Sequence, residues 1–294
     1  MSHIFGVITA LLLVVHTIIL GGGLLLCLPA KVLAPKRYSR FVITPWIEGI
    51  ATAWRAGIIW WLRRVYGAQW DIERPEGLSR DQWYLVTANH QSWTDIFVLY
   101  HLFLHRAPLL KFFIKQQLLY LPIVGQAWWG LDFPFMKRYT REYLEKHPEK
   151  AGQDLIATKR ACEEFSHRPT SVMSFLEGTR FTEQKHAKQQ SPYRHLLKPK
   201  AGGITFTIQA LGDRFPGLTD VTIVYEGRTP TFWDLMCGRV PRVIGEVRTV
   251  EIPDFIREGD YENDEAFRQR AKDWLAQLWH EKDERIEALT QSSP

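Results

Sequence analysis

The feature that most constrains the fold is an apolar run near the N-terminus. Residues 4–28 (IFGVITALLLVVHTIILGGGLLLCL) contain no charged residue other than His16. As a helix the run would be about 37 Å long, which is enough for a hydrocarbon core of about 30 Å. A signal peptide is the alternative, but it would need basic residues before the run, and residues 1–3 have none. We therefore predict a membrane anchor over residues 1–30. The three glycines at 21–23 leave open whether it spans the bilayer or forms a bent hairpin in one leaflet.

The basic residues near this run follow it rather than precede it. Lys31, Lys36, Arg37 and Arg40 come directly after the apolar segment. By the positive-inside rule, we expect the rest of the chain to face the cytoplasm. We expect the membrane to be the cell inner (cytoplasmic) membrane. The three cysteines are far apart and odd in number, which favours reduced thiols over a disulfide framework.

A second membrane-related segment is expected over residues 31–68. Apolar residues recur at helical spacing over 44–66, from a start near Pro45, and Arg55, Arg63 and Arg64 supply charge. One interpretation is an amphipathic helix in the membrane interface. The other is a helix packed on the folded core. The twelve tryptophans of the chain fit either, because tryptophan is favoured at membrane interfaces and is also ordinary core material.

The rest of the chain alternates between strand and helix patterns. We expect strands at 70–73, 83–86, 131–138, 171–176, 219–225 and 242–252, and helices at 95–103, 140–168 and 201–211. This order predicts an α/β domain over residues 69–260, with a mixed central sheet flanked by helices. We expect residues 261–294 to form a C-terminal amphipathic helix (263–288), which docks on the α/β domain, and a tail.

Residues 109–131 are very apolar but are interrupted by Lys111, Lys115 and Pro122. The segment is too broken to span a membrane. It would suit a helix that faces the bilayer or lines an apolar tunnel, and plain core is the alternative.

The segment that carries chemistry is WYLVTANHQSWTDIFVL, residues 83–99. A strand-like run ends in a polar turn at 89–92, and a helical pattern begins at Trp93, which is a usual place for a site in an α/β protein. His90 can exchange a proton near neutral pH, and Asp95 can orient it, so the pair predicts a general base acting on a substrate hydroxyl. The alternative is structural: Ser92 and Asp95 also fit a capping box.

A second polar cluster follows the strand at 171–176. There Glu177, Gly178, Thr179 and Arg180 combine a carboxylate, a residue that allows a tight turn, and a guanidinium suited to phosphate. They suggest a polar ligand site more than a structural turn. Lys137 and Arg138 end another short strand, and residues 183–200 read as a basic, mobile loop.

Two other classes of function are disfavoured. The net charge of +5 suits an anionic surface or substrate, but the chain has no zinc-finger spacing and no basic run interleaved with exposed aromatics, so we expect no nucleic-acid binding. His101 and His105 have the spacing of metal ligands on a helix, but no Glu follows His101 to complete a zinc-protease motif. We expect no metal site.

Several blocks of this chain resemble one family in the same order. They are NHQSWTD (89–95), FMKR (135–138), FLEGTR (175–180), PKAGG (199–203) and DVTIVY (220–225). The chain is thereby similar, over roughly residues 83–226, to glycerophospholipid acyltransferases of the 1-acylglycerol-3-phosphate acyltransferase type. The segments NHQSW, LKFFIKQQL, DFPFMKR and LEGTR are similar to those of the branch that includes lysocardiolipin and related lysophospholipid acyltransferases, and they also resemble a set of bacterial inner-membrane acyltransferases. Leu176 stands where the family usually has proline, and 220–224 replace its usual proline-containing fourth block.

The resemblance implies an activity and roles for these residues. His90 would take the proton of a lysophospholipid hydroxyl and Asp95 would orient His90, while the hydroxyl attacks the thioester of acyl-CoA or acyl-carrier protein without an acyl-enzyme. Lys137, Arg138, Glu177, Gly178, Thr179, Arg180 and Lys200 would bind the acceptor's head group. No cofactor is implied.

The acceptor implied is 1-acylglycerol-3-phosphate, which would give phosphatidic acid. The alternatives are a remodelling enzyme for another lysolipid, lysocardiolipin-like or an amino-acid lipid, and a catalytically inactive, membrane-anchored lipid-binding protein. Chain-length preference, donor and oligomeric state stay open.

Overall fold

The computed structural model describes residues 2–72, 76–136, 146–147, 153–261 and 263–291. A six-stranded sheet lies at its centre, in the order β1-β8-β7-β2-β6-β3. The strands β2, β3, β6 and β7 are parallel, whereas β8 is antiparallel to β7 and β1 pairs with β8. The strands are β1 (Trp70–Ile72), β2 (Tyr84–Ala88), β3 (Leu110–Phe112), β6 (Ser171–Ser174), β7 (Leu218–Tyr225) and β8 (Val243–Val250), with β4 (Ile114–Lys115) and β5 (Phe135–Met136) in a separate two-stranded sheet.

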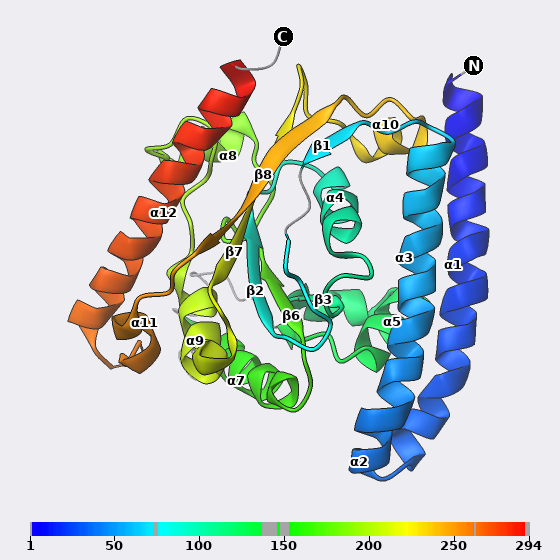
Figure 1. Ribbon diagram of the computed structural model, residues 1–294, viewed down its shortest axis with the longest axis horizontal. Coiled ribbons are helices and arrows are strands. Elements are labelled where there is room, and N and C mark those ends of the chain that lie inside the picture. The colour runs from blue at the N-terminus through cyan, green and yellow to red at the C-terminus, as the bar shows by residue number, and fades with distance from the viewer. Residues whose placement is uncertain (1, 73–75, 137–145, 148–152, 262, 292–294) are drawn as a thin grey trace.

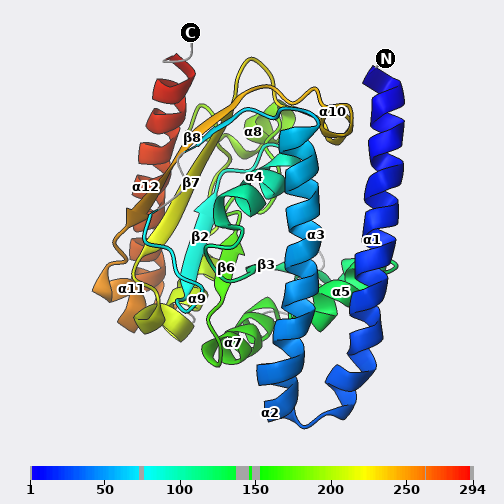
Figure 2. The same ribbon diagram turned by 45° about the vertical axis from the view of Figure 1, so that its right-hand side comes forward.

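Helices cover both faces of the sheet, which confirms the predicted α/β class (Figures 1 and 2). One face carries α3 and α4, and the other carries α7, α9 and α12. The helices and helical turns are α1 (Ser2–Leu33), α2 (Lys36–Tyr38), η1 (Ser39–Ile43), α3 (Thr44–Arg64), α4 (Thr94–Phe103), η2 (Gln116–Tyr120), α5 (Val124–Gly130), α7 (Gln153–Ser166), α8 (Glu183–Gln189), α9 (Ala201–Leu211), η4 (Gly212–Arg214), α10 (Phe232–Met236), α11 (Asp254–Glu258) and α12 (Glu265–Gln291).

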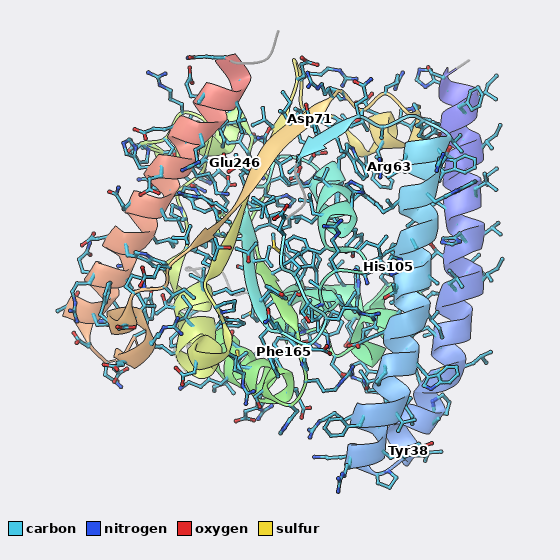
Figure 3. All side chains as sticks on the ribbon, viewed as in Figure 1. Tyr38, Arg63, Asp71, His105, Phe165 and Glu246 are labelled. Atoms are coloured by element: carbon cyan, nitrogen blue, oxygen red, sulfur yellow. The ribbon has the colours of Figure 1, made fainter. Side chains whose placement is uncertain are left out.

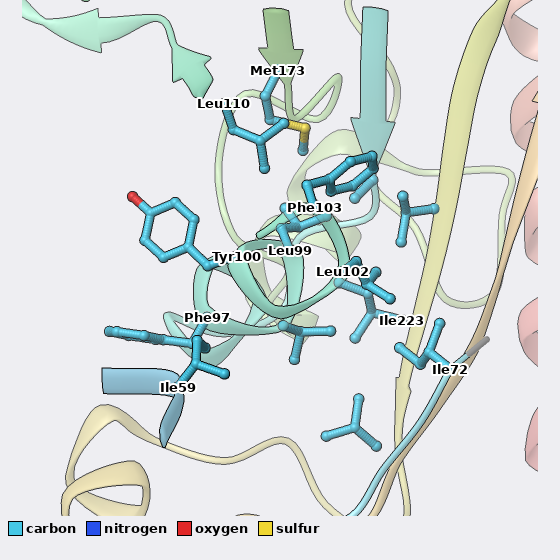
Figure 4. Close-up of a cluster of buried hydrophobic side chains, with 14 of the residues drawn as sticks. Ile59, Ile72, Phe97, Leu99, Tyr100, Leu102, Phe103, Leu110, Met173 and Ile223 are labelled. Atoms are coloured by element: carbon cyan, nitrogen blue, oxygen red, sulfur yellow. The ribbon is translucent and has the colours of Figure 1, made fainter. Parts of the chain in front are cut away.

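The two cores follow from the alternation of side chains along the strands. In β7, Val221, Ile223 and Tyr225 point to the cluster around α4, whereas Leu218 and Val224 point to α9 and α12. Figure 4 shows the first cluster, in which side chains of α4 meet those of β3, β6 and β7. Each residue of β7 is buried, so the strand has no solvent face.

Helices α1 and α3 form an antiparallel hairpin along one side of the domain, with Tyr38 at its turn (Figures 2 and 3). Within the described residues, α1 is the one helix long and apolar enough to cross a membrane by length and composition, and it continues through the glycines at 21–23 without a break. The Trp54 indole N–H donates to Thr17 at 3.0 Å, and the His16 ring bonds the Trp54 carbonyl at 3.1 Å. Both expectations for α3 have some support, since Ile58 and other residues pack in the core whereas Trp46 and Trp60 are exposed.

Two segments differ from the sequence-based expectation. Residues 109–131 do not form one helix but β3, β4, η2 and α5, because Leu110 extends the sheet and Pro122 cannot donate a backbone hydrogen bond. The basic segment 183–200 is not a plain loop, since its first half is α8, capped where the Thr182 hydroxyl accepts from Lys185 N at 3.2 Å. The short helices α10 and α11 were not predicted.

The C-terminal helix α12 docks on the sheet as expected, but through a buried charge pair as well as apolar contacts. Lys282 and Asp220 have no exposed side-chain surface, and Lys282 Nζ lies 2.7 Å from Asp220 Oδ1. Lys282 also donates to the Val221 carbonyl at 2.7 Å, and Arg248 donates to Asp220 Oδ2 at 3.0 Å. These contacts fix α12 against the middle of β7.

Candidate active site

The two polar turns predicted from the sequence lie at the same edge of the sheet. β2 and β6 pair in parallel from Tyr84 opposite Ser171 to Thr87 opposite Ser174, so the turns that follow them are neighbours. β7 runs parallel on the other side of β2, with Ala88 opposite Val221. The carboxyl edge of parallel strands is the usual place for a site in such sheets.

Asn89 fixes the first turn against β7. Its side-chain amide donates to the Ile223 carbonyl and accepts from the Ile223 N–H, each at 2.8 Å. The side chain thus replaces a backbone peptide and extends the pairing of β2 by one position. Sequence reasoning gave Asn89 no role of its own.

His90 and Asp95 form the predicted pair. His90 Nδ1 lies 2.9 Å from Asp95 Oδ2, and the same oxygen accepts the backbone N–H groups of Gln91 at 2.7 Å and Ser92 at 2.9 Å. The His90 ring also stacks on Phe175, with 3.9 Å between ring centroids. With Nδ1 held by the carboxylate, Nε2 is the nitrogen that can accept a proton.

The structural interpretation of Asp95 is right in part. Asp95 accepts the Ser92 N–H, but α4 begins at Thr94 with Trp93 as its N-cap, so Ser92 and Asp95 do not form the predicted capping box. The Ser92 hydroxyl accepts from Thr94 N at 3.1 Å and donates to the Pro230 carbonyl at 2.6 Å. One buried carboxylate therefore closes the start of α4 and orients His90 at the same time.

Tyr225 is a member of this cluster that sequence reasoning missed. Its hydroxyl donates to the second Asp95 oxygen, Oδ1, at 2.5 Å. Burial, and then the charge of Asp95, raise the pKa of Tyr225 well above its ordinary value, so the hydroxyl stays protonated and keeps donating. The alternation of side chains along β7 could have revealed it, because Tyr225 lies two and four positions after Ile223 and Val221 and so shares their face of the sheet, toward α4.

Glu177 joins the two polar turns from a fully buried position. Its Oε1 accepts the His90 backbone N–H at 2.8 Å and its Oε2 accepts that of Leu197 at 2.9 Å. Burial disfavours the charged carboxylate and raises the pKa of Glu177 to about 7, although both hydrogen bonds oppose this. Both carboxylate oxygens accept backbone N–H groups, so Glu177 links the turn after β2 to the segment that contains Leu197.

The remaining predicted ligand residues that the structure describes lie together beside His90. Gly178 has φ +70, and a methyl group built on it would lie 3.1 Å from Lys200 Nζ. The Arg180 guanidinium lies 5.0 Å from the centre of the Trp93 ring, and Lys185 Nζ donates to the Thr179 hydroxyl at 2.8 Å. The second block residues Lys137 and Arg138 lie outside the described residues.

An apolar cavity of about 630 Å³ begins at this cluster. His90, Gly178, Thr179 and Arg180 line one part of it, and α1, α3, α4, β3 and α5 provide most of the other walls. Its volume lies within the range of about 300–1,000 Å³ that is usual for ligand pockets. The 109–131 segment lines this cavity, although not as a single helix.

The described residues contain no group of three or more His, Cys, Asp or Glu side chains placed to hold a metal ion. His101 is buried with its ring 4.8 Å from that of Trp70, and His105 lies beyond the end of α4. The two histidines therefore do not share one helix, and the metal-ligand spacing does not correspond to a helical face.

Comparison with known proteins agrees with these observations. A family model described as acyltransferase matches residues 69–226. The chain is 26% identical over 182 residues to mouse 1-acyl-sn-glycerol-3-phosphate acyltransferase delta, covering 59% of this chain and 43% of that protein. It is also 26% identical over 184 residues to the human gamma form, covering 59% of this chain and 44% of that protein. The matched region therefore spans less than half the length of these relatives.

The fold also resembles a solved structure. The crystal structure of the 1-acyl-sn-glycerophosphate (LPA) acyltransferase PlsC from Thermotoga maritima aligns with 98% of this chain and 95% of that chain, at a TM-score of 0.53 and 19% identity. At that identity the likeness shows a shared fold. Together with the family model, which covers more than half of the sequence, it establishes that this chain belongs to the acyltransferase family.

Proposed function

We propose that this protein transfers a fatty acyl group from a thioester donor to the free hydroxyl of 1-acylglycerol-3-phosphate, giving phosphatidic acid. The observation that carries the proposal is the His90–Asp95 pair, held at 2.9 Å, at the mouth of a large apolar cavity. The relatives named for 1-acyl-sn-glycerol-3-phosphate support this choice of acceptor.

The chemistry follows from the free nitrogen of His90. Nε2 takes the proton of the acceptor hydroxyl as its oxygen attacks the thioester carbonyl carbon. The C–S bond then breaks, and the leaving thiolate takes the proton from the imidazolium. Asp95 stabilises the imidazolium between these steps. General-base help of this kind contributes about 10² to 10⁴ in rate.

The cationic residues beside His90 suit the acceptor's phosphate. Lys200 lies beside Gly178, Arg180 lines the same cavity, and a guanidinium can bind phosphate through two parallel hydrogen bonds. Thr179 adds a hydroxyl, and its partner Lys185 adds a further positive charge. We expect Lys137 and Arg138 to contribute as well, as the family resemblance implies.

The apolar cavity is the proposed site for an acyl chain. Its walls include Leu24 of α1, Ile50 of α3 and Ala127 of α5, so the hairpin forms part of the site. Donor type, acyl-CoA or acyl-carrier protein, is left to experiment.

We further propose that α1 lies in the plane of one leaflet and does not cross the bilayer. Gly6 packs against Cys237, Gly21 against Ile123, and Leu28 against Gly130. These contacts with the α/β domain are spread along about 33 Å of helix, so a spanning α1 would pull the domain into the bilayer. The uncovered apolar side of α1 would face lipid, which supports a monotopic protein on the cytoplasmic side of the membrane.

An impermeant thiol reagent tests this topology in intact and opened cells. Ser2→Cys and Lys36→Cys mark the two ends of α1, and the unmodified chain controls for its three native cysteines. In-plane insertion predicts that both positions react only after the cytoplasm is opened. Labelling of Ser2→Cys in intact cells would show a spanning helix instead.

Acyl transfer by the purified, detergent-solubilised protein tests the proposed activity. The acceptors are lysophosphatidic acid and a panel of other lysophospholipids, with labelled acyl-CoA and acyl-carrier protein as donors. We expect transfer to lysophosphatidic acid that is lost in His90→Ala and kept in His280→Ala, an exposed histidine of α12. Transfer only to another lysolipid would make the protein a remodelling enzyme. A folded protein that transfers to no acceptor would be a lipid-binding protein.

A further inference from the structure

Tyr225 occupies a position that the two-residue description of the site leaves unexplained. It is the last residue of β7, buried, on the sheet face that meets the start of α4. Asn89 fixes the register there by pairing with Ile223, two residues before Tyr225. The fixed register of β7 therefore restricts the position of the Tyr225 hydroxyl, which lies 2.5 Å from Asp95 Oδ1.

The hydrogen bonds of Asp95 are divided unequally between its oxygens. Oδ2 accepts three N–H groups, from the His90 ring and from the backbone of Gln91 and Ser92. At Oδ1, the hydrogen bond recorded within the described part of the chain is the one from Tyr225. Because Asp95 has no exposed surface, an Oδ1 without that donor would be a buried charged atom without a partner.

We infer that Tyr225 is a positioning residue for the catalytic pair. Its hydroxyl holds the Asp95 carboxylate in the rotation that directs Oδ2 to His90, and it shares the negative charge that His90 experiences. This inference rests on the proposed acyl transfer for its kinetic consequence, but not for its effect on the hydrogen bond between His90 and Asp95.

The direction of that effect follows from the groups around His90. Asp95 faces its ring from α4, Glu177 accepts its backbone N–H from the turn after β6, Tyr225 approaches from β7, and the Arg180 guanidinium lies over the Trp93 ring. The positive charge of Lys282, in α12, acts on Glu177. Removing the Tyr225 hydroxyl concentrates the charge of Asp95 on Oδ2, so the hydrogen bond between His90 Nδ1 and Oδ2 should become stronger.

The test is Tyr225→Phe beside a matched control, Tyr84→Phe. Tyr84 is equally buried on the same sheet face, but its hydroxyl bonds Ser79 N and Gln82 at the opposite end of β2. For Tyr225→Phe we expect kcat to fall about ten- to a hundredfold with little change in either KM, the loss typical of one hydrogen bond to a charged group. Tyr84→Phe should change neither kcat nor KM.

The NMR signal of the His90 Nδ1–H proton gives a readout that does not need activity. A downfield shift of this signal in Tyr225→Phe supports the inference even if the wild type shows no acyl transfer, a result that would refute the proposed function alone. If Tyr225→Phe fails to fold, 3-fluorotyrosine at position 225 keeps the shape and strengthens the donor, and should move the signal upfield. An unchanged signal, or equal losses of activity in Tyr225→Phe and Tyr84→Phe, would overturn the inference.

Discussion

Replacing Asp95 with Asn separates the charge of this residue from its geometry. The backbone N–H groups of Gln91 and Ser92 both point at the Oδ2 position, so the amide oxygen of the variant should lie there. The amide NH₂ then faces Tyr225, whose hydroxyl oxygen can accept a hydrogen bond. His90 Nδ1–H still donates to an oxygen, and Nε2 remains the basic nitrogen.

What the variant loses is the attraction between the carboxylate and the imidazolium. The 2.9 Å contact puts the two charges about 4 Å apart, and at an effective dielectric constant of about 20 this is worth about 4 kcal/mol. That energy corresponds to a fall in kcat of about 10³-fold. In a serine-protease triad the same change also reverses the tautomer and costs about 10⁴. We expect the smaller loss here because the backbone donors prevent the reversal.

The assay is steady-state acyl transfer by Asp95→Asn, His90→Ala and wild type in the same detergent. Thermal melting is recorded alongside, and Asp95→Asn should melt within a few degrees of wild type because it keeps its hydrogen bonds and removes a buried charge. A loss of less than tenfold would refute the idea that Asp95 stabilises the imidazolium. A loss equal to that of His90→Ala, in a folded protein, would refute the preserved tautomer.

Three further outcomes follow from other parts of the structure. Burial raises the pKa of Glu177 from 4.5 to about 7, so the folded state binds the Glu177 proton more tightly than the unfolded state does. This proton adds about 3 kcal/mol to the free energy of unfolding. The contribution is complete below pH 4.5 and is lost as the pH rises through 7. Urea unfolding at pH 5 and pH 7.5 should show this slope in wild type and not in Glu177→Gln, and an equal slope in both would contradict it. Filling the cavity by Ala127→Phe should lower the use of long relative to short acyl donors by about tenfold or more, whereas Ala187→Phe on exposed α8 should not. Lys282→Met should destabilise the fold by about 3–5 kcal/mol, because it leaves the Asp220 carboxylate buried with one cationic partner fewer, and an unchanged urea midpoint would show that Arg248 suffices.

The parts of the site that the sequence predicted are those whose residues are close in the chain. His90 and Asp95 are separated by four residues, and the 177–180 segment is continuous, so a strand followed by a polar turn was enough to find them. The alternation of strand and helix patterns likewise predicted the α/β class and most of the strands.

The parts that it missed depend on partners far apart in the chain. Asn89 bonds Ile223 across 134 positions and Tyr225 reaches Asp95 across 130, so the local pattern around each residue did not reveal its partner. For segment 109–131 the expectation of a single helix was wrong, whereas lining an apolar site was one of the alternatives left open. Its apolar composition is what both a membrane-facing helix and the wall of a cavity need, and only the tertiary structure separates the two.

The buried pair of Lys282 and Asp220 has a consequence for how the protein is made. His90 leaves the ribosome early, but Glu177, which holds its backbone, lies 87 positions later, and Lys282 lies 61 positions beyond Val221, whose carbonyl it binds. Contacts between residues this far apart in the chain form late in folding, and the apolar surface that they cover stays exposed until then. During translation, α1 can therefore associate with a bilayer long before the His90–Asp95 pair has its final surroundings. We expect the nascent chain to be membrane-bound and inactive until α12 has emerged and closed the far side of the sheet.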